Sequence, residues 1–435
     1  MTTTYDPHHP QYLDEADVRG ELARVFDVCN GCRRCIARCS SFPTMFSSIE
    51  RHEDRDAGRM TPAQQDQVVD ECFQCKLCVV ECPYTPGQHE WEIDVPRLML
   101  RAGAMRHATG QTPVHGRLAT GVMARTDLVG ALATRAAPLA NAVIGAEPGS
   151  LVRRFVQAAT GLSAQRVVPS FSKVRFSSWF ATRPKVRLAH RQARVAVFPT
   201  CLVEYQRPAV GRDLVRVYER NGIECTIASG ARCCGAPWLH AGDVEAFAEA
   251  ARKNVTALAS AVRGGNDIVV PEPTCSYVLR HDYPDHVGGA TATLVAEHTY
   301  DACEYLMKVH TGDGTRLDTD FTGAVPSHVT YHAPCHLRAQ GVGSTSRDLL
   351  ALTGAEVTTV QQCSGMDGMW GLRAENADLS LRMAESLAEA IGQAGGEVVS
   401  GDCHLANTAI SEQTGRVPLH PLQVVARAYG IPEND

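Results

Sequence analysis

Two runs of cysteines with the same spacing constrain the fold of this chain more than any other feature. The runs are Cys29-x2-Cys32-x2-Cys35-x3-Cys39 and Cys72-x2-Cys75-x2-Cys78-x3-Cys82. Three cysteines at this spacing let a short loop place three thiolates around one iron–sulfur cluster, and the fourth reaches the neighbouring cluster. Structural zinc, the alternative, typically uses paired Cys-x2-Cys units separated by a longer gap. The spacing therefore predicts two [4Fe–4S] clusters.

The displaced fourth cysteine of each run determines the expected ligand sets. We expect one cluster to use Cys29, Cys32, Cys35 and Cys82, and the other to use Cys72, Cys75, Cys78 and Cys39. Pro83 after the second run fits the ferredoxin pattern, whereas Ser40 and Ser41 follow the first run. Four cations lie close to the runs: Arg33, Arg34, Arg38 and Lys76. They either offset the negative charge of the clusters or are solvated loop charges.

The composition excludes several functional classes. A net charge of −6 over 435 residues gives no support for nucleic-acid binding. Residues 1–20 lack the apolar core of a secretion signal. Seventeen cysteines without such a signal favour metal ligation in a reducing cytoplasm over a disulfide framework. The sequence has no run of about eighteen apolar residues, so no membrane-spanning helix is expected. A peripheral position at the inner face of the membrane is the alternative location.

Helical signals surround the two cysteine runs. Val18, Leu22, Val25, Phe26 and Cys29 recur at helical spacing. The segment 61–64 resembles a capping box with proline at the first helical position, and a helix from there would end at Cys72. Asp94 before an apolar segment predicts another helix start. These signals favour an α-helical ferredoxin domain over residues 1–110.

Residues 111–190 are predicted to form a helical and basic connector. Residues 116–160 predict two amphipathic helices broken near 147–150, which pack on the chain itself or dock to a partner or membrane face. A basic stretch follows, and we expect it to be a flexible connector with a solvated charged face. Its residues are Lys173, Arg175, Arg183, Lys185, Arg187, Arg191 and Arg194.

The second half of the chain contains a repeat. Segments 191–320 and 321–435 share the order strand, Cys, helix, strand, Cys, Gly, helix, strand, Cys. Strands alternating with helices predict two tandem α/β domains with parallel sheets, so the whole chain is expected to be an α+β multidomain protein. The cysteines follow strands, where open α/β sheets place their ligands.

Each repeat has its own set of candidate metal ligands. In repeat 1 these are Cys201, Cys233, Cys234 and Cys275. Four thiolates suffice for a further iron–sulfur cluster, while zinc or buried thiols are the alternatives. In repeat 2 they are Cys335, Cys363 and Cys403, with His332, His336 and His404. This set predicts a mixed Cys/His metal site; the alternative is a degenerate repeat kept for packing or partner contact. Cys225 and Cys303 are expected to be small core residues.

The element Cys233-Cys234-Gly235, between Cys201 and Cys275, resembles the CCG domains of heterodisulfide-reductase-related iron–sulfur proteins. Tandem cluster motifs followed by two such domains are similar to the iron–sulfur subunits of anaerobic glycerol-3-phosphate dehydrogenases and glycolate oxidases. In heterodisulfide reductases, the five cysteines of each CCG domain hold a noncubane cluster, and this is the arrangement that the resemblance implies.

This chain departs from the five-cysteine pattern in both repeats. Glu272 stands at the first cysteine of the closing pair in repeat 1. Ser364 replaces the middle cysteine in repeat 2, and Ala406 the last. The resemblance therefore does not carry a noncubane cluster to repeat 2. Glu272 either ligates a metal or is a satisfied carboxylate near a strand end.

The resemblance implies an iron–sulfur electron-transfer subunit of an oxidoreductase complex. A flavin-containing dehydrogenase partner would supply electrons, and a quinone or another acceptor would receive them from the CCG half. The chain has no Gly-x-Gly-x-x-Gly motif between a strand and a helix, so we expect substrate oxidation on a partner, and no catalytic residue is assigned. The rival functions are a thiol–disulfide reductase with the CCG metal site as its active centre, and a non-redox scaffold or sensor.

Overall fold

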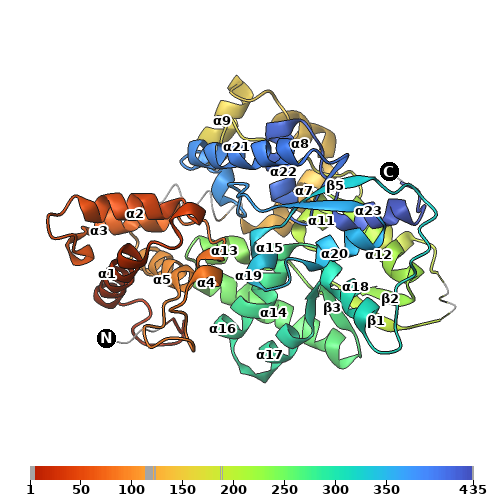
Figure 1. Cartoon of the computed structure of the whole chain (residues 1–435), viewed down its shortest axis with the longest axis horizontal. Coiled ribbons are helices and arrows are strands. Elements are labelled where there is room, and N and C mark those ends of the chain that lie inside the picture. Colours follow the sequence, from red (N-terminus) through yellow and green to blue (C-terminus); the bar gives the residue numbers. More distant parts are fainter. Residues whose placement is uncertain (1–4, 113–120, 122–123, 187, 189, 434–435) are drawn as a thin grey trace. The chain divides into compact units, whose positions relative to one another are not determined.

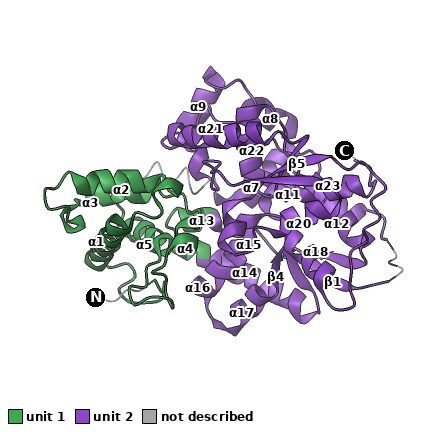
Figure 2. Ribbon diagram, viewed as in Figure 1, with its two compact units in different colours: residues 1–121, 237–247 green, residues 122–236, 248–435 purple. Residues whose placement is uncertain are grey.

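The computed structural model describes residues 5–112, 121, 124–186, 188 and 190–433. The chain divides into two compact units (Figure 2). Unit 1 comprises Met1–Gly121 with Pro237–Phe247, and unit 2 comprises Val122–Ala236 with Ala248–Asp435. Among the described residues, no helix combines the length and the apolar character needed to cross a bilayer.

Unit 1 is helical throughout its described residues, as expected of an α-helical ferredoxin domain. Its helices before the connector are α1 Glu15–Cys32, α2 Ser41–Glu50, α3 Pro62–Glu71, α4 Leu77–Glu81 and α5 Val95–Ala108 (Figure 1). The predicted capping box forms, because Thr61 accepts from the Gln64 N–H while the Gln64 side chain accepts from the Thr61 N–H. Asp94 caps α5 by accepting from the Arg97 N–H. Both predicted helix starts are confirmed.

The apolar stripe of α1 forms the centre of the unit 1 core. Val18, Leu22, Val25 and Phe26 are buried, as their helical spacing predicted. They pack with apolar side chains from the next helices, which are Phe42, Met45, Phe46, Ile49, Leu98, Met99 and Met105. Burial of this stripe fixes α1, whose last turn carries Cys29 and Cys32. The core thereby positions the first cysteine run.

The middle segment contains more helices than the sequence predicted. The described residues form α7 Thr126–Arg135, α8 Ala137–Ile144 and α9 Leu151–Thr160, where two helices were expected. A proline near the start of α8 separates it from α7, because proline favours the first turn of a new helix. The predicted break at 147–150 is confirmed, and Ser150 caps α9. The start of the predicted stretch, residues 116–120, lies outside the described residues.

The basic stretch is more ordered than expected. Helix α10 spans Phe176–Thr182, and Arg183 directly after it pairs with Glu219 at 2.7 Å. Its guanidinium also lies 4.3 Å from the centre of the Phe180 ring. The prediction of a flexible, solvated connector is therefore wrong for Arg183, whereas Arg187 lies outside the described residues. Packing against α12 immobilises the Arg183 guanidinium. The charge pattern of the sequence did not indicate this contact.

Unit 2 contains two parallel sheets with corresponding strand orders. The first has the order β2-β1-β3-β4, from β1 Ala193–Val197, β2 Ile223–Ile227, β3 Asp267–Val270 and β4 Thr299–Asp301. The second has the order β6-β5-β7, from β5 His328–His332, β6 Glu356–Val360 and β7 Val398–Gly401. In each sheet the first strand lies between the next two, pairing Val195 with Cys225 and Asp267, and Tyr331 with Thr359 and Ser400. The predicted duplication of parallel α/β domains is confirmed.

Helices connect the strands of both sheets along the chain, and of these α13 from Pro237 on and the first residues of α14 belong to unit 1. Those of repeat 1 are α11 Cys201–Tyr205, α12 Pro208–Arg220, α13 Ala236–His240, α14 Val244–Arg263, α15 Pro273–Tyr277, α16 Tyr283–Val287, α17 Gly289–Glu297 and α18 Ala302–Thr311. Those of repeat 2 are α19 Cys335–Ala339, α20 Thr345–Leu352, α21 Ala377–Ala394, α22 His404–Thr414 and α23 Pro421–Ala428. Cys225 and Cys303 are buried in the apolar core around β1, as predicted.

Candidate iron–sulfur sites

Residues in the left-handed conformation bend the backbone around the cysteines of unit 1. Arg33 ends α1 with a φ of 54° and donates its N–H to the Cys29 carbonyl. In the second run, Gln74 and Lys76 have φ values of 59° and 64°. Such conformations are uncommon for residues other than glycine and often mark functional loops. Here they turn the chain sharply between successive thiols.

The second predicted ligand set surrounds a cavity. A space of about 400 Å³, its open side included, is lined by all four of its members together with Cys35. The other lining residues are Arg38, Phe73, Gln74, Lys76, Val95 and Pro96. Lys76 is buried there and donates to Gln74 Oε1 at 2.7 Å. A buried ammonium group beside four thiols suits an anionic thiolate-ligated cluster.

The electrostatics of the thiols fit a bound cationic metal. Burial, followed by Cys82, Cys35 and Cys32, raises the pKa of Cys29. Burial, followed by Cys75, Cys39 and Cys72, raises the pKa of Cys78. The thiols that raise these pKa values most strongly after burial are members of the same predicted set. Four crowded thiolates are unfavourable without a cation, and iron would supply that positive charge.

In repeat 1 the strand order brings the four cysteines together. Cys201 begins α11 directly after β1, Cys233 and Cys234 follow β2, and Cys275 lies in α15 after β3. The sulfur atoms of Cys275 and Cys234 are 3.3 Å apart. A hydrogen bond with the Cys201 thiol, and a second with Cys234, lower the pKa of Cys233 well below its usual value. Hydrogen bonds to Cys233 and burial raise the pKa values of Cys201 and Cys234 well above the usual value, so without a metal the group favours a single thiolate, at Cys233.

Three residues that the sequence did not identify position these cysteines. Asp127 in α7 accepts from the Cys233 backbone N–H at 2.9 Å. Asn254 in α14 donates to the Cys233 carbonyl at 3.0 Å, and the Tyr283 hydroxyl donates to the Cys234 carbonyl at 2.9 Å. Asn254 could have been suspected as a polar residue on an apolar helix face. Asp127 had no such signal, because it lies about a hundred residues from Cys233 in sequence.

In repeat 2, two of the three histidines make hydrogen bonds to groups other than the cysteines. His332 Nε2 lies 3.1 Å from the Gln362 carbonyl, and His336 Nδ1 lies 3.0 Å from Thr274 Oγ1. Burial lowers the pKa of His332 to about 4 and that of His404 to about 3, so both imidazoles are neutral. Cys335, Cys363 and Cys403 follow their strands as expected. A metal in repeat 2 stays a prediction.

Glu272 connects the two repeats. Its carboxylate accepts from the His404 backbone N–H at 3.1 and 3.4 Å, and burial raises its pKa well above the usual value. Helix α22 begins at His404, and the side chain of its N-cap residue, Cys403, makes no capping bond. Glu272 therefore caps α22 in place of a local side chain. This geometry favours the satisfied carboxylate over a metal ligand.

We expect Glu272→Ala to lower the free energy of unfolding by about 1–2 kcal/mol, because the α22 N–H loses its acceptor. Glu272→Gln keeps an oxygen that can accept this bond, so it should stay within about 1 kcal/mol of the parent protein. Chemical denaturation measures both effects, and neither variant should change the iron content. Loss of iron in Glu272→Gln would instead identify the carboxylate as a ligand.

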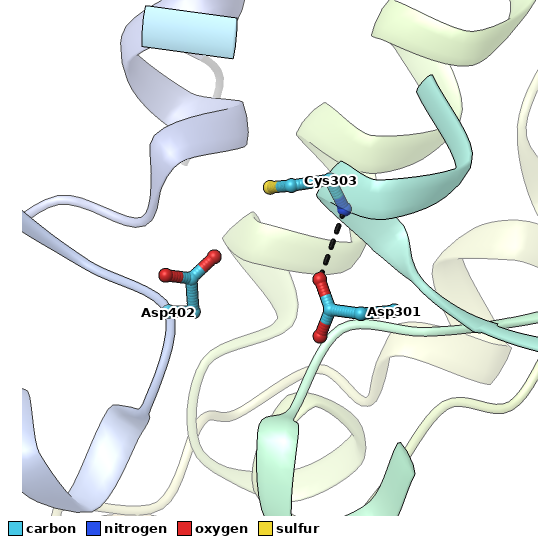
Figure 3. A group of neighbouring side chains, drawn as sticks. All are labelled: Asp301, Cys303 and Asp402. Atoms are coloured by element: carbon cyan, nitrogen blue, oxygen red, sulfur yellow. Dashed lines mark hydrogen bonds between the residues drawn. The ribbon is translucent and has the colours of Figure 1, made fainter. Parts of the chain in front are cut away.

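A second buried group connects the repeats. Oxygen or sulfur atoms of Asp301, Cys303 and Asp402 lie within 4.8 Å of one another, the one such group of potential metal ligands among the described residues (Figure 3). Asp301 caps α18 by accepting from the Cys303 N–H. Asp402 accepts from the Tyr331 and Ser346 hydroxyls, each at 2.7 Å. These bonds give the two carboxylates structural roles.

The fold and the cysteine sets define an iron–sulfur protein with a dicluster domain followed by two cysteine-rich domains. Residues 22–83 match the family model described as "4Fe-4S dicluster domain", and residues 195–280 and 329–408 match "Cysteine-rich domain" CCG. The chain is an iron–sulfur electron-transfer subunit homologous to the C subunit of anaerobic glycerol-3-phosphate dehydrogenase from Escherichia coli. The two are 28% identical over 404 residues, which cover 83% of this chain and 99% of the relative.

Two further relatives share part of this plan. The B subunit of fumarate reductase (CoM/CoB) from Methanothermobacter marburgensis is 28% identical over 54% of this chain and 47% of its own length. Lactate utilization protein A of Bacillus cereus is 29% identical over 48% of this chain and 87% of its own length. The resemblance that the CCG element and the tandem cysteine runs predicted is confirmed, as are iron–sulfur clusters as its cofactors.

Proposed function

We propose that this chain accepts electrons from a flavin-containing dehydrogenase partner and passes them through the CCG half to a quinone or another acceptor. The observation that supports the proposal is the proximity of the unit 1 thiols: Cys72, Cys75, Cys78 and Cys39 line one cavity together with Cys35, and Cys82, Cys35 and Cys32 lie close enough to Cys29 to raise its pKa after burial. The two [4Fe–4S] clusters held there supply one-electron carriers. The relatives named as subunits support a redox partner, on which substrate oxidation would occur. The complex would lie in the cytoplasm or at the inner face of the membrane.

Within this proposal, the protein's own residues hold and insulate the carriers. The predicted sets remain Cys29, Cys32, Cys35 with Cys82, and Cys72, Cys75, Cys78 with Cys39. Lys76 and the apolar residues around the second set exclude water. Because water no longer screens them, nearby charges have a larger influence on the reduction potential of that cluster. The four thiols of repeat 1 would hold a third metal centre on the way to the acceptor.

The surface around Cys32 is the proposed point of exchange with the partner. Cys32 is exposed, whereas the second set has no exposed member. Two apolar side chains near the first set, Ile36 and Val80, are 44% and 52% exposed. Arg34 is exposed; burial raises the pKa of Cys82, and Arg34 lies close enough to that thiol to offset a small part of the rise. A partner with an acidic rim around its own redox centre would complement this surface.

Arg34→Glu should slow reduction of the clusters by an acidic flavoprotein about tenfold at low salt, because electrostatic steering depends on complementary charge. Stopped-flow absorbance with chemically reduced flavodoxin as the probe measures this rate. Dithionite should also reduce the clusters of the parent protein and of Arg34→Glu. The two dithionite rates should differ far less than the two flavodoxin rates. Clusters whose spectra never change between reducing and oxidising conditions would refute electron transfer itself.

Arg59→Glu is the matched control. Arg59 is an exposed arginine of the same unit, in the short helix Ala57–Arg59 that packs on α1. This short helix lies near the N-terminal half of α1, because Arg19 of α1 donates to the carbonyl of Pro62, three residues after Arg59. The thirteen helical residues from Arg19 to Cys32 separate these two residues by about 20 Å. Equal slowing in both variants would show that only net charge matters and would contradict the proposed surface.

A further inference from the structure

The two cysteine runs of unit 1 carry a cation at the same position. Arg33 follows the second cysteine of the first run, and Lys76 follows the second cysteine of the second run. Both residues have a left-handed backbone, with φ values of 54° and 64°. Because the backbone geometry is equivalent, the surroundings of these two side chains show how the two cluster sites differ.

The cation of the first run pairs with a carboxylate at the surface. The Arg33 guanidinium lies 2.7 Å from Glu50 and also donates to Asn30 Oδ1 at 2.6 Å. The side chains of Arg33 and Glu50 are 39% and 43% exposed. The carboxylate offsets the charge of Arg33, and water screens what is left of it. Arg33 therefore has little influence on a cluster in the first set.

The cation of the second run lies in the wall of the thiol cavity. Lys76 is only 3% exposed and lines the cavity of the second ligand set. Its Nζ donates to Gln74 Oε1 at 2.7 Å, and Gln74 Nε2 donates to Cys72 Sγ at 3.6 Å. These two bonds, with the amide between them, keep the ammonium within about 9 Å of that sulfur. Nearby positive charge and hydrogen bonds to sulfur both favour the reduced state of a cluster.

Burial and Lys76 act on the second cluster in opposite directions. Reduction adds one negative charge, which a site without water disfavours, and no cysteine of the second set is exposed. A unit charge about 9 Å away, at an effective dielectric constant of about 20, raises the ratio of reduced to oxidised cluster by more than tenfold. Arg38 also lines this cavity, but its guanidinium is 40% exposed and pairs with Glu81 at 3.1 Å. Lys76 is therefore the cation that offsets burial.

We propose that Lys76, held by Gln74, sets the reduction potential of the second cluster and makes it the more easily reduced of the two. One electron that enters the first cluster near Cys32 then moves to the second, so the first is oxidised as the second is reduced. The inference rests on the proposed function and adds to it the cluster on which electrons collect.

A redox titration of the anaerobically purified full chain, followed by electron paramagnetic resonance, tests this role. Lys76→Met removes the charge and keeps a long apolar side chain. At a fixed ambient potential, the ratio of reduced to oxidised second cluster should fall at least about tenfold, which corresponds to about 59 mV for one electron. The ratio for the first cluster should change less than about twofold, and the iron content should stay that of the parent protein.

Arg33→Met is the matched control, because it makes the same kind of change at the equivalent position of the first run. It should change either ratio less than about twofold, since Glu50 and water already offset this charge. Gln74→Glu places a carboxylate beside Lys76, as Glu50 lies beside Arg33. It should lower the same potential as Lys76→Met while the lysine stays. If Lys76→Met does not assemble both clusters, Gln74→Glu decides.

Cys75→Ser, which should keep only the first cluster, assigns the two potentials. Its remaining potential should be the lower of the two in the parent protein, and a match to the higher one would overturn the proposed order. Unchanged potentials in Lys76→Met and Gln74→Glu would overturn the role of Lys76, as would equal shifts in Lys76→Met and Arg33→Met. Each of these results comes from clusters that still accept electrons, whereas failure of the proposed function would appear as clusters that never change.

Discussion

Replacing Cys75 with serine is expected to remove one of the two [4Fe–4S] clusters, a loss of about four iron atoms per chain. Cys75 lines the cavity that the second ligand set encloses, and a serine hydroxyl is a poor substitute for a thiolate. Iron and acid-labile sulfide per chain, with electron paramagnetic resonance of the reduced protein, measure the loss. Two clusters alone correspond to about eight irons in the parent protein, and a third cluster in the CCG half to about twelve.

Cys225→Ala is the matched control for this substitution. Cys225 is a buried cysteine in β2 that packs in the apolar core, and its thiol donates to the Ile223 backbone carbonyl at 3.8 Å. Its replacement should leave the iron content and the spectra unchanged. Equal iron loss in the two variants would contradict the ligand assignment, because a general loss of folding would then explain both. A colourless, zinc-filled parent protein would contradict the clusters altogether.

Replacing Cys234 with alanine is expected to remove the metal centre of repeat 1 while the dicluster signals persist. Its sulfur lies 3.3 Å from that of Cys275, and its backbone carbonyl is held by Tyr283. Without Cys234 only three thiols remain, so a four-thiolate cluster loses a ligand. Metal analysis for iron and zinc should show about four irons fewer per chain, or about one zinc fewer if zinc occupies the site.

Cys303→Ala provides the comparison within the same unit. Cys303 is fully buried and lies beside Asp301 and Asp402. We expect its metal content to equal that of the parent protein. Equal metal content in Cys234→Ala and the parent protein would identify the four thiols as buried core residues, which is the alternative that the sequence left open.

The helical part of the fold could be predicted where local signals were strong. The stripe of Val18, Leu22 and Phe26 fixed the buried face of α1, and the capping box at Thr61 fixed the start of α3. The duplicated order of strands and cysteines predicted two parallel sheets, because short connections through helices allow few other topologies. The predicted number of helices between residues 116 and 160 was wrong, because the sequence does not show where one short amphipathic helix ends and the next begins.

The sequence by itself determined which thiols exist and how they are spaced, because a loop of fixed length can bring only certain cysteines to one cluster. It could not identify Asp127, Asn254 or Tyr283 as supports of the repeat 1 cysteines, nor Glu272 as the cap of α22. Those roles depend on hydrogen bonds between segments far apart in the chain, and no local periodicity encodes such contacts. Only the tertiary structure distinguished Lys76 from Arg33, because packing buries Lys76 in the wall of a thiol cavity, whereas Arg33 pairs with Glu50 at the surface.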